Sequence, residues 1–118
     1  RVTAGRYDEA FLGMSEVGVP KAGPDATWSY QSYVVVLDEH IDRDAVIARM
    51  ANSGIETTVG TYACHKHPAF SKWVLRSGDL PNSARFAKQT LTLPVVPRMT
   101  ASQVDRVVEA LFLAIGSS

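Results

Sequence analysis

The 118-residue sequence lacks most of the features that mark a special class of protein. A single cysteine cannot form an internal disulfide, which favours a reducing compartment such as a bacterial-type cytoplasm. No apolar run approaches the roughly 20 residues of a membrane-spanning helix, and no signal peptide is visible. An excess of charge of one sign is also lacking, because 12 basic side chains balance 12 acidic ones along the chain. This balance disfavours binding to nucleic acid and polybasic attachment to a membrane.

The remaining composition is that of an ordinary globular domain. Apolar residues make up 46% of the chain and charged residues 20%. The length fits one compact domain of about 100–150 residues, and no repeat, linker or low-complexity tract divides it. We therefore predict a single domain over residues 1–118. The chain begins at Arg1 rather than at a methionine, which we interpret as the sign of a processed, trimmed or excised piece.

Hydrophobic periodicity and capping residues predict five helical segments, which span residues 2–14, 43–54, 69–76, 82–89 and 101–116. Asp42 can cap the second segment, and Gly54 is suited to end it. Thr100 and Gln103 can form a capping box before the last segment. The expected buried stripes are Tyr7, Ala10, Phe11 and Met14 in the first helix, and Val104, Val107, Val108, Leu111 and Ile115 in the last.

Three short strands complete the predicted fold. The clearest covers residues 28–38, and the other two lie within residues 55–59 and 91–97. The run from Val34 to Val36 is apolar at every position, which predicts burial on both faces. Glycines and prolines between residues 18 and 24 predict a loop. The order of elements indicates an α+β fold in which a small three-stranded sheet is covered by helices.

Reactive side chains are concentrated in residues 54–70, GIETTVGTYACHKHPAF, and zinc is the first chemistry to consider. Cys64, His65 and His67 are ligand types that suit this ion. Neighbouring residues of an extended segment point to opposite faces, so Cys64 and His65 would not readily share one ion. A closed site also needs four ligands, and His40 is the only other histidine. These points disfavour a metal site.

A Cys-His nucleophile is the second possibility for this stretch. Catalytic dyads usually bring the two residues together from separate parts of a fold, and Cys64 lies in no recognisable nucleophile signature. A lone cysteine is more often a small buried hydrophobe than a nucleophile. In an arbitrary domain, Tyr62, Cys64 and His65 would be ordinary turn and core residues.

Four stretches in one order carry a more specific signal: YQSYVVVLD, the pair Arg43-Asp44 before a helix, GIETTVGTYACHKHPAF and LTLPVVPRMTASQVDRVVEAL. Together they resemble the C-terminal part of the DegT/DnrJ/StrS-type sugar aminotransferases, which are pyridoxal-phosphate (PLP) enzymes of aspartate aminotransferase fold. The resemblance runs from about Tyr7 to Leu111. It implies a small C-terminal domain that packs on a large domain carrying the cofactor site.

The resemblance also implies which residues face the substrate. In that family the tyrosine/histidine segment reaches towards the sugar side of the active site. Tyr62 and His65, with help from Thr61, are therefore implied to bind a nucleotide-linked sugar. A phenol and an imidazole suit sugar hydroxyls and a diphosphate as donors or acceptors. The chain departs from the family pattern at Ala63, where many members have proline, and at Lys66-His67.

The catalytic parts of such an enzyme are implied to lie outside this chain. Its lysines are Lys21, Lys66, Lys72 and Lys88, and none lies in the serine-rich, glycine-following context of the family's Schiff-base lysine. The acidic partner of the pyridinium nitrogen and the phosphate-binding loop are expected upstream of Arg1. We therefore expect no cofactor in this chain, PLP in its full-length parent, and no activity of the isolated chain.

Two hypotheses about function stay open at this point. The first is a fragment of a PLP-dependent enzyme that converts a nucleotide-linked keto-sugar to an amino-sugar, with glutamate as donor. The alternative is a stand-alone α+β small-molecule-binding or interaction module. Under the first hypothesis, apolar surface meant for the missing large domain is exposed, so the isolated domain should self-associate. Trp73, Phe11 and Met14 are the candidate contributors, and the alternative for each is an ordinary core position, which is the commoner role of such residues.

Overall fold

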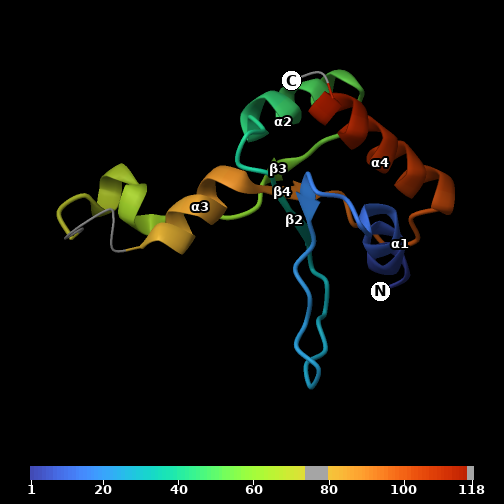
Figure 1. Cartoon of the computed structure of the whole chain (residues 1–118), viewed down its shortest axis with the longest axis horizontal. Coiled ribbons are helices and arrows are strands. Elements are labelled where there is room, and N and C mark those ends of the chain that lie inside the picture. Colours follow the sequence, from blue (N-terminus) through green and yellow to red (C-terminus); the bar gives the residue numbers. More distant parts are fainter. Residues whose placement is uncertain (74–79, 117–118) are drawn as a thin grey trace.

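A computed structural model describes residues 1–73 and 80–116 of the chain. The α-helices are α1 (Val2–Phe11), α2 (Arg43–Asn52), α3 (Pro81–Gln89) and α4 (Ala101–Gly116); the 3₁₀ helices are η1 (Cys64–Lys66) and η2 (Pro68–Phe70); the strands are β1 (Val17–Gly18), β2 (Tyr33–Leu37), β3 (Thr58–Val59) and β4 (Thr90–Leu93). The strands form one antiparallel sheet in the order β1-β2-β4-β3 (Figure 1). The fold is α+β as predicted. The described residues contain four strands, however, and not three.

The strand that the sequence did not reveal is β1. Val17 and Gly18 pair with Leu37 and Val36 of β2, and Val17 is buried. Two residues are too few to show the alternation by which a strand is recognised, and Gly18 lies among the residues that predicted a loop. The error therefore comes from the length of the strand.

The central strand β2 is shorter than predicted. It begins at Tyr33, so the prediction that it starts at Trp28 is wrong. Residues 19–32 instead form a long loop that projects from the sheet (Figure 1). Tyr30 lies in this loop with a φ of 51°, a left-handed conformation that an extended strand does not contain.

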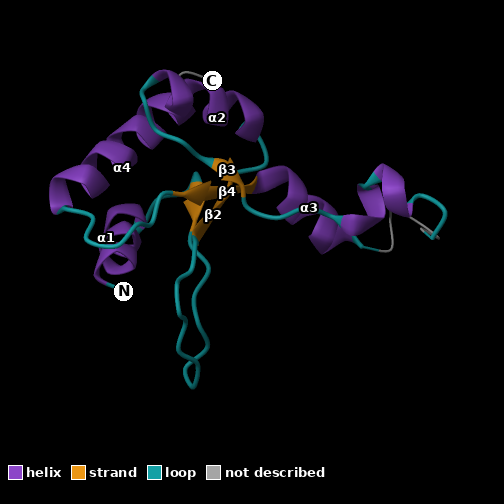
Figure 2. Ribbon diagram, turned by 180° about the vertical axis from the view of Figure 1, so that it is seen from behind, coloured by secondary structure: helices purple, strands orange, loops and turns teal. Residues whose placement is uncertain are grey.

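One face of the sheet packs against α1, α2 and α4 to form the core. Along β2 the buried residues alternate with Val34 and Val36, which are half-buried, so the prediction of burial on both faces is confirmed only in part. Figures 1 and 2 show these three helices gathered on one side of the sheet, with α3 extending away from them. The largest fully buried side chains are Tyr7, Leu37, Met50, Leu91, Leu93 and Leu111.

The predicted helix caps are confirmed. The Asp42 carboxylate accepts a hydrogen bond of 3.1 Å from the Ala45 N–H at the start of α2. Thr100 and Gln103 bond reciprocally before α4, at 2.9 Å and 3.1 Å. After α2, Gly54 adopts the left-handed conformation with a φ of 77°. These local signals fix where α2 and α4 lie in the sequence.

Two other helix predictions are confirmed only in part. The first helix ends at Phe11, and Met14 packs half-buried against the core beyond it. The predicted helix over residues 69–76 appears as the short turn η2, and residues 74–76 lie outside the described residues. Within residues 1–73 and 80–116, no helix is both long and apolar enough to cross a membrane.

Candidate functional site

The chain leaves the sheet at Gly60 and enters the segment that holds the sequence-predicted site residues. Thr61 is exposed, and the ring of Tyr62 is 77% exposed. Ala63 is buried and turns the chain into η1. His65 is half-buried, and its Nε2 atom is buried with no hydrogen-bond partner among the described residues. The segment therefore presents a hydroxyl and a phenol to the outside, with an unpaired imidazole nitrogen behind them.

Backbone and side-chain bonds from β4 hold the beginning of this segment. The Gly60 N–H donates to the Thr90 carbonyl at 3.1 Å. The Thr61 N–H donates to Oγ1 of Thr90 at 3.0 Å. Gly60 leaves no room for a side chain, because a Cβ there would lie 2.6 Å from Cβ of Thr90 and 2.7 Å from Cγ1 of Val34. The position of Thr61 is thus fixed by the sheet.

Two expectations about the reactive residues are wrong. Cys64 is exposed and is not a buried core residue. It also lies in a 3₁₀ helix, so the argument that it and His65 point to opposite faces of an extended segment does not apply. In the part of the chain that the structure describes, no three His, Cys, Asp or Glu side chains gather as a candidate metal site. His67 has a local role, since its Nδ1 accepts from the Ala69 N–H at 3.2 Å and caps η2.

Residues 61–73 and 80–89, which we call the arm, carry a series of exposed apolar side chains. Figure 2 shows the arm extending from the sheet on the side opposite α4. Its exposed side chains are Tyr62, Phe70, Trp73, Leu80 and Phe86. Trp73 is 79% exposed, in line with the expectation that it forms contact surface. The same expectation is wrong for Phe11, which is buried in the core, and Met14 is half-buried.

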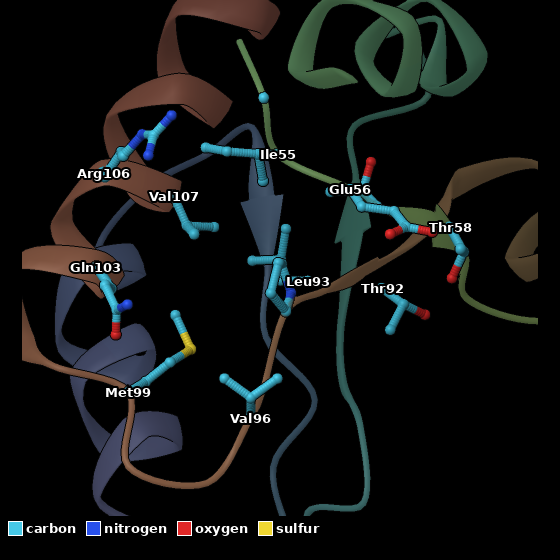
Figure 3. A pocket seen from close by; sticks show the side chains of 13 residues that line it. Ile55, Glu56, Thr58, Thr92, Leu93, Val96, Met99, Gln103, Arg106 and Val107 are labelled. Atoms are coloured by element: carbon cyan, nitrogen blue, oxygen red, sulfur yellow. The ribbon is translucent and has the colours of Figure 1, made fainter. Parts of the chain in front are cut away.

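A separate hollow of about 470 Å³ lies between α4 and the edge of the sheet. In Figure 3, Gln103 and Arg106 of α4 form one side, Glu56 and Thr58 the other, and apolar side chains lie between them. The full lining is Gly54, Ile55, Glu56, Thr57, Thr58, Thr92, Leu93, Pro94, Val96, Met99, Gln103, Arg106 and Val107. Oγ1 of Thr57 is buried there without a partner among the described residues. None of the sequence-predicted site residues lines this hollow, and sequence reasoning did not find it because its walls lie about 50 residues apart in the chain.

The buried tyrosines of the core are neutral structural groups. Burial raises the pKa of Tyr7 to about 12, and its hydroxyl donates to the Pro94 carbonyl at 2.7 Å. Burial, together with a 2.6 Å hydrogen bond to the Asp8 carboxylate, raises the pKa of Tyr33 well above its usual range. Both phenols therefore stay protonated at neutral pH and brace α1 against the sheet.

Comparison with known proteins identifies the family. The family model of the DegT/DnrJ/EryC1/StrS aminotransferases matches residues 1–112. The chain belongs to this family. The resemblance stated from the sequence is therefore confirmed, and it covers nearly the whole chain.

Three relatives define what the chain is similar to. It is 32% identical to the spore coat polysaccharide biosynthesis protein SpsC of Bacillus subtilis (strain 168), over 92% of the chain and 29% of SpsC. It is 28% identical to dTDP-3-amino-3,4,6-trideoxy-alpha-D-glucose transaminase of Streptomyces venezuelae, over 92% of the chain and 28% of that enzyme. The solved structure of Spr1654 from Streptococcus pneumoniae in its PLP form has a TM-score of 0.88 at 19% identity, over 98% of the chain and 30% of Spr1654. The chain thus spans less than a third of the length of these family members.

The family depends on PLP. The four lysines of this chain are all exposed, so the described residues by themselves form no enclosed lysine site for that cofactor. Of these lysines, Lys66 and Lys72 lie on the arm, and no carboxylate pairs with either in the described residues. We therefore assign no cofactor contact to any lysine of this chain.

Proposed function

We propose that this chain is the small C-terminal domain, residues 1–118, of a PLP-dependent aminotransferase that converts a nucleotide-linked keto-sugar to an amino-sugar. The observation that carries the proposal is the family match over residues 1–112, joined to an exposed Thr61–Tyr62 segment that the sheet holds in place. The relative from Streptomyces venezuelae is a transaminase of a dTDP-linked amino-sugar, which supports the substrate class.

In this proposal, Tyr62, His65 and Thr61 form the sugar side of the active site. The exposed Tyr62 phenol can donate to or accept from a sugar hydroxyl or a diphosphate oxygen. Thr61 offers a second hydroxyl beside it. A buried polar atom without a partner is costly, so the unpaired Nε2 of His65 favours a partner that the described residues do not supply.

The large domain of the parent would supply the rest of the site. It would carry the Schiff-base lysine, the acidic partner of the pyridinium nitrogen and the phosphate-binding loop, so the isolated chain would be inactive. Exposed apolar side chains of the arm would face that domain or a second copy of the chain, and the isolated domain would self-associate. A strictly monomeric sedimentation profile at high concentration would contradict this part of the proposal. The exposed free thiol of Cys64 agrees with a reducing compartment, and we place the parent in the cytoplasm.

The test of the function uses the full-length protein that contains this chain. We expect it to show the visible absorption of bound PLP, which glutamate bleaches and a nucleotide-linked keto-sugar restores, with the amino-sugar detected by mass spectrometry. A full-length protein without a PLP absorption band would refute the proposal. Restoration by simple keto acids but not by any nucleotide-linked keto-sugar would refute its substrate class.

The hollow beside α4 favours a second candidate, a small-molecule-binding module. Its guanidinium at Arg106 and its carboxylate at Glu56, with an apolar floor between them, suit a zwitterionic amino acid. Calorimetry of the 118-residue chain with amino acids and with nucleotide sugars separates the two candidates. Tight binding of an amino acid that Arg106→Ala abolishes would favour this module, and no heat of binding would reject it.

A further inference from the structure

Thr90, the first residue of β4, makes hydrogen bonds to several separate parts of the chain. It is only 4% exposed. Its hydroxyl donates to the Phe86 carbonyl of α3 at 2.5 Å and accepts from the Thr61 N–H at 3.0 Å. Its carbonyl accepts from the Gly60 N–H at 3.1 Å and from Nη1 of Arg43 at 3.0 Å. One residue therefore joins α2, α3 and β4 to the start of the segment that holds Tyr62.

The two hydrogen bonds of the Thr90 hydroxyl depend on each other. Because its proton points to the Phe86 carbonyl, an oxygen lone pair is left to accept the Thr61 N–H. A hydroxyl in this arrangement sets the direction of the Thr61 amide. Neither an alkyl side chain nor a pure donor can replace it.

The chain at Gly60 lies so close to Thr90 that its backbone has little room to move. With 2.6 Å between a hypothetical Cβ of Gly60 and Cβ of Thr90, the Gly60 backbone lies directly against the Thr90 side chain. The Arg43 guanidinium adds a further bond, of 2.7 Å, to the Ala87 carbonyl in the last turn of α3. The backbone that leads into Tyr62 is therefore held by Thr90 of β4, which is itself bonded to α2 and α3.

We propose that Thr90 is a positioning residue for the sugar-binding segment: through its hydroxyl it orients the Thr61 amide, and thereby sets where Tyr62 meets the substrate. The link to the substrate rests on the proposed function, whereas the link to Thr61 rests on the bonds above. Thr90 itself touches no substrate in this account. A change at Thr90 should weaken sugar binding and leave the reaction with the amino donor intact.

The variants are made in the full-length protein that contains this chain. Thr90→Val keeps the shape of the side chain and removes both hydrogen bonds, and Thr90→Ser keeps both bonds and removes a methyl group. Thr92→Val is the matched control, because it removes a hydroxyl from the same strand that bonds weakly to the Val59 carbonyl, at 3.4 Å. If Thr90→Val does not fold, Thr90→Ala removes the same hydroxyl with less bulk and is judged by the same measurements.

The first readout is hydrogen exchange at the Thr61 amide, resolved by residue. We expect Thr90→Val to speed this exchange at least tenfold, and Thr90→Ser and Thr92→Val to leave it within about twofold of the wild type. The second readout is KM for the nucleotide-linked sugar. We expect a rise of about tenfold for Thr90→Val and recovery to near the wild-type value for Thr90→Ser, with the rate of the amino-donor half-reaction unchanged in both.

Unchanged Thr61 exchange in Thr90→Val would overturn the inference, and so would faster exchange without any change in KM. Equal losses in both half-reactions would assign Thr90 a merely structural role and overturn it too. Tyr62→Phe, measured in the same assay, separates the two proposals. If Tyr62→Phe raises KM for the sugar and Thr90→Val does not, the inference fails and the proposed function stands. If both variants leave this KM unchanged, the proposed role of the segment fails and the inference fails with it.

Discussion

Replacement of Gly60 by alanine tests whether the sheet holds the candidate segment as tightly as the distances indicate. The new Cβ would lie 2.6 Å from Cβ of Thr90 and 2.7 Å from Cγ1 of Val34, and ordinary contact begins at 3.4 Å. The neighbours must therefore move by about 0.8 Å. Thr90 cannot easily yield, because its hydroxyl and carbonyl bond to three other elements. Forcing extra volume into such a site costs about 1–3 kcal/mol.

Gly60 does not have a positive φ, so this cost comes from the contact and not from backbone strain. Urea denaturation of the 118-residue chain measures it. With a slope of about 1.5 kcal/mol per M, the midpoint should fall by about 0.7–2 M. Gly5→Ala in α1 is the matched control: its Cβ would meet nothing within 4 Å, and alanine in a helix should stabilise by about 0.5–1 kcal/mol. A neutral or stabilising Gly60→Ala would refute the close packing of the segment on β4.

Three further predictions concern the cap, the core and the candidate site. Asp42→Ala removes the hydrogen bond from the Ala45 N–H, so the free energy of unfolding measured in urea should fall by about 1 kcal/mol. Asp42→Asn keeps an acceptor at this position, and its free energy of unfolding should stay close to that of the wild type. Because burial raises the pKa of Tyr7 from 10.0 to about 12, the folded state keeps a proton that the unfolded state loses. The contribution of Tyr7 to stability should be constant below about pH 10 and be lost as the pH rises towards 12. Tyr7→Phe should make the alkaline fall in stability shallower in a pH series of thermal unfolding, with Tyr33 responsible for the part that stays, and an unchanged slope would contradict the assignment. Tyr62→Phe in the full-length protein should raise KM for the nucleotide-linked sugar by about 2- to 12-fold. This rise is the equivalent of about 0.5–1.5 kcal/mol, the contribution of one hydrogen bond. An unchanged KM in steady-state kinetics would count against the role of Tyr62 in sugar binding.

Local signals in the sequence were enough to place α2 and α4. The caps at Asp42 and Thr100 and the stripe on α4 depend on residues three or four positions apart. The structure has both caps and four of the five stripe residues as predicted, and Ile115 is partly buried. The sheet was harder to predict, because pairing depends on residues far apart in the chain. Val17 becomes a strand only through its pairing with Leu37, and no pattern within two residues could show this. The projecting loop before Tyr33 was misjudged for the same reason, since aromatic residues favour strands only when a partner strand is present.

The sequence allowed us to name the residues of the candidate site, but not to predict what surrounds them. The family resemblance pointed to Thr61, Tyr62 and His65, and their role as substrate ligands remains a prediction. Their surroundings could not be read from the sequence. The bonds from Thr90 to Thr61 connect positions 29 residues apart, and the contact of Thr90 with Gly60 depends on the register of β3 with β4. A threonine in a strand gives no local sign that its hydroxyl bonds to a distant loop.

Three arginines tie helices of the molecule to one another, and one of them, Arg43, ties the arm to the core. Each guanidinium reaches a carbonyl at the C-terminal end of another helix, where carbonyls lack partners within their own helix. Arg49 of α2 bonds to the Ala114 carbonyl of α4 at 2.8 Å, and Arg106 of α4 bonds to the Ser53 carbonyl after α2 at 3.2 Å. This pair ties α2 and α4 to each other. Arg43, at the other end of α2, makes the same kind of contact with α3, which belongs to the arm. Its side chain is only 11% exposed, so solvent screens these bonds little. Because Arg43 also bonds to the Thr90 carbonyl, α2 links the core both to the arm and to the start of the segment that holds Tyr62.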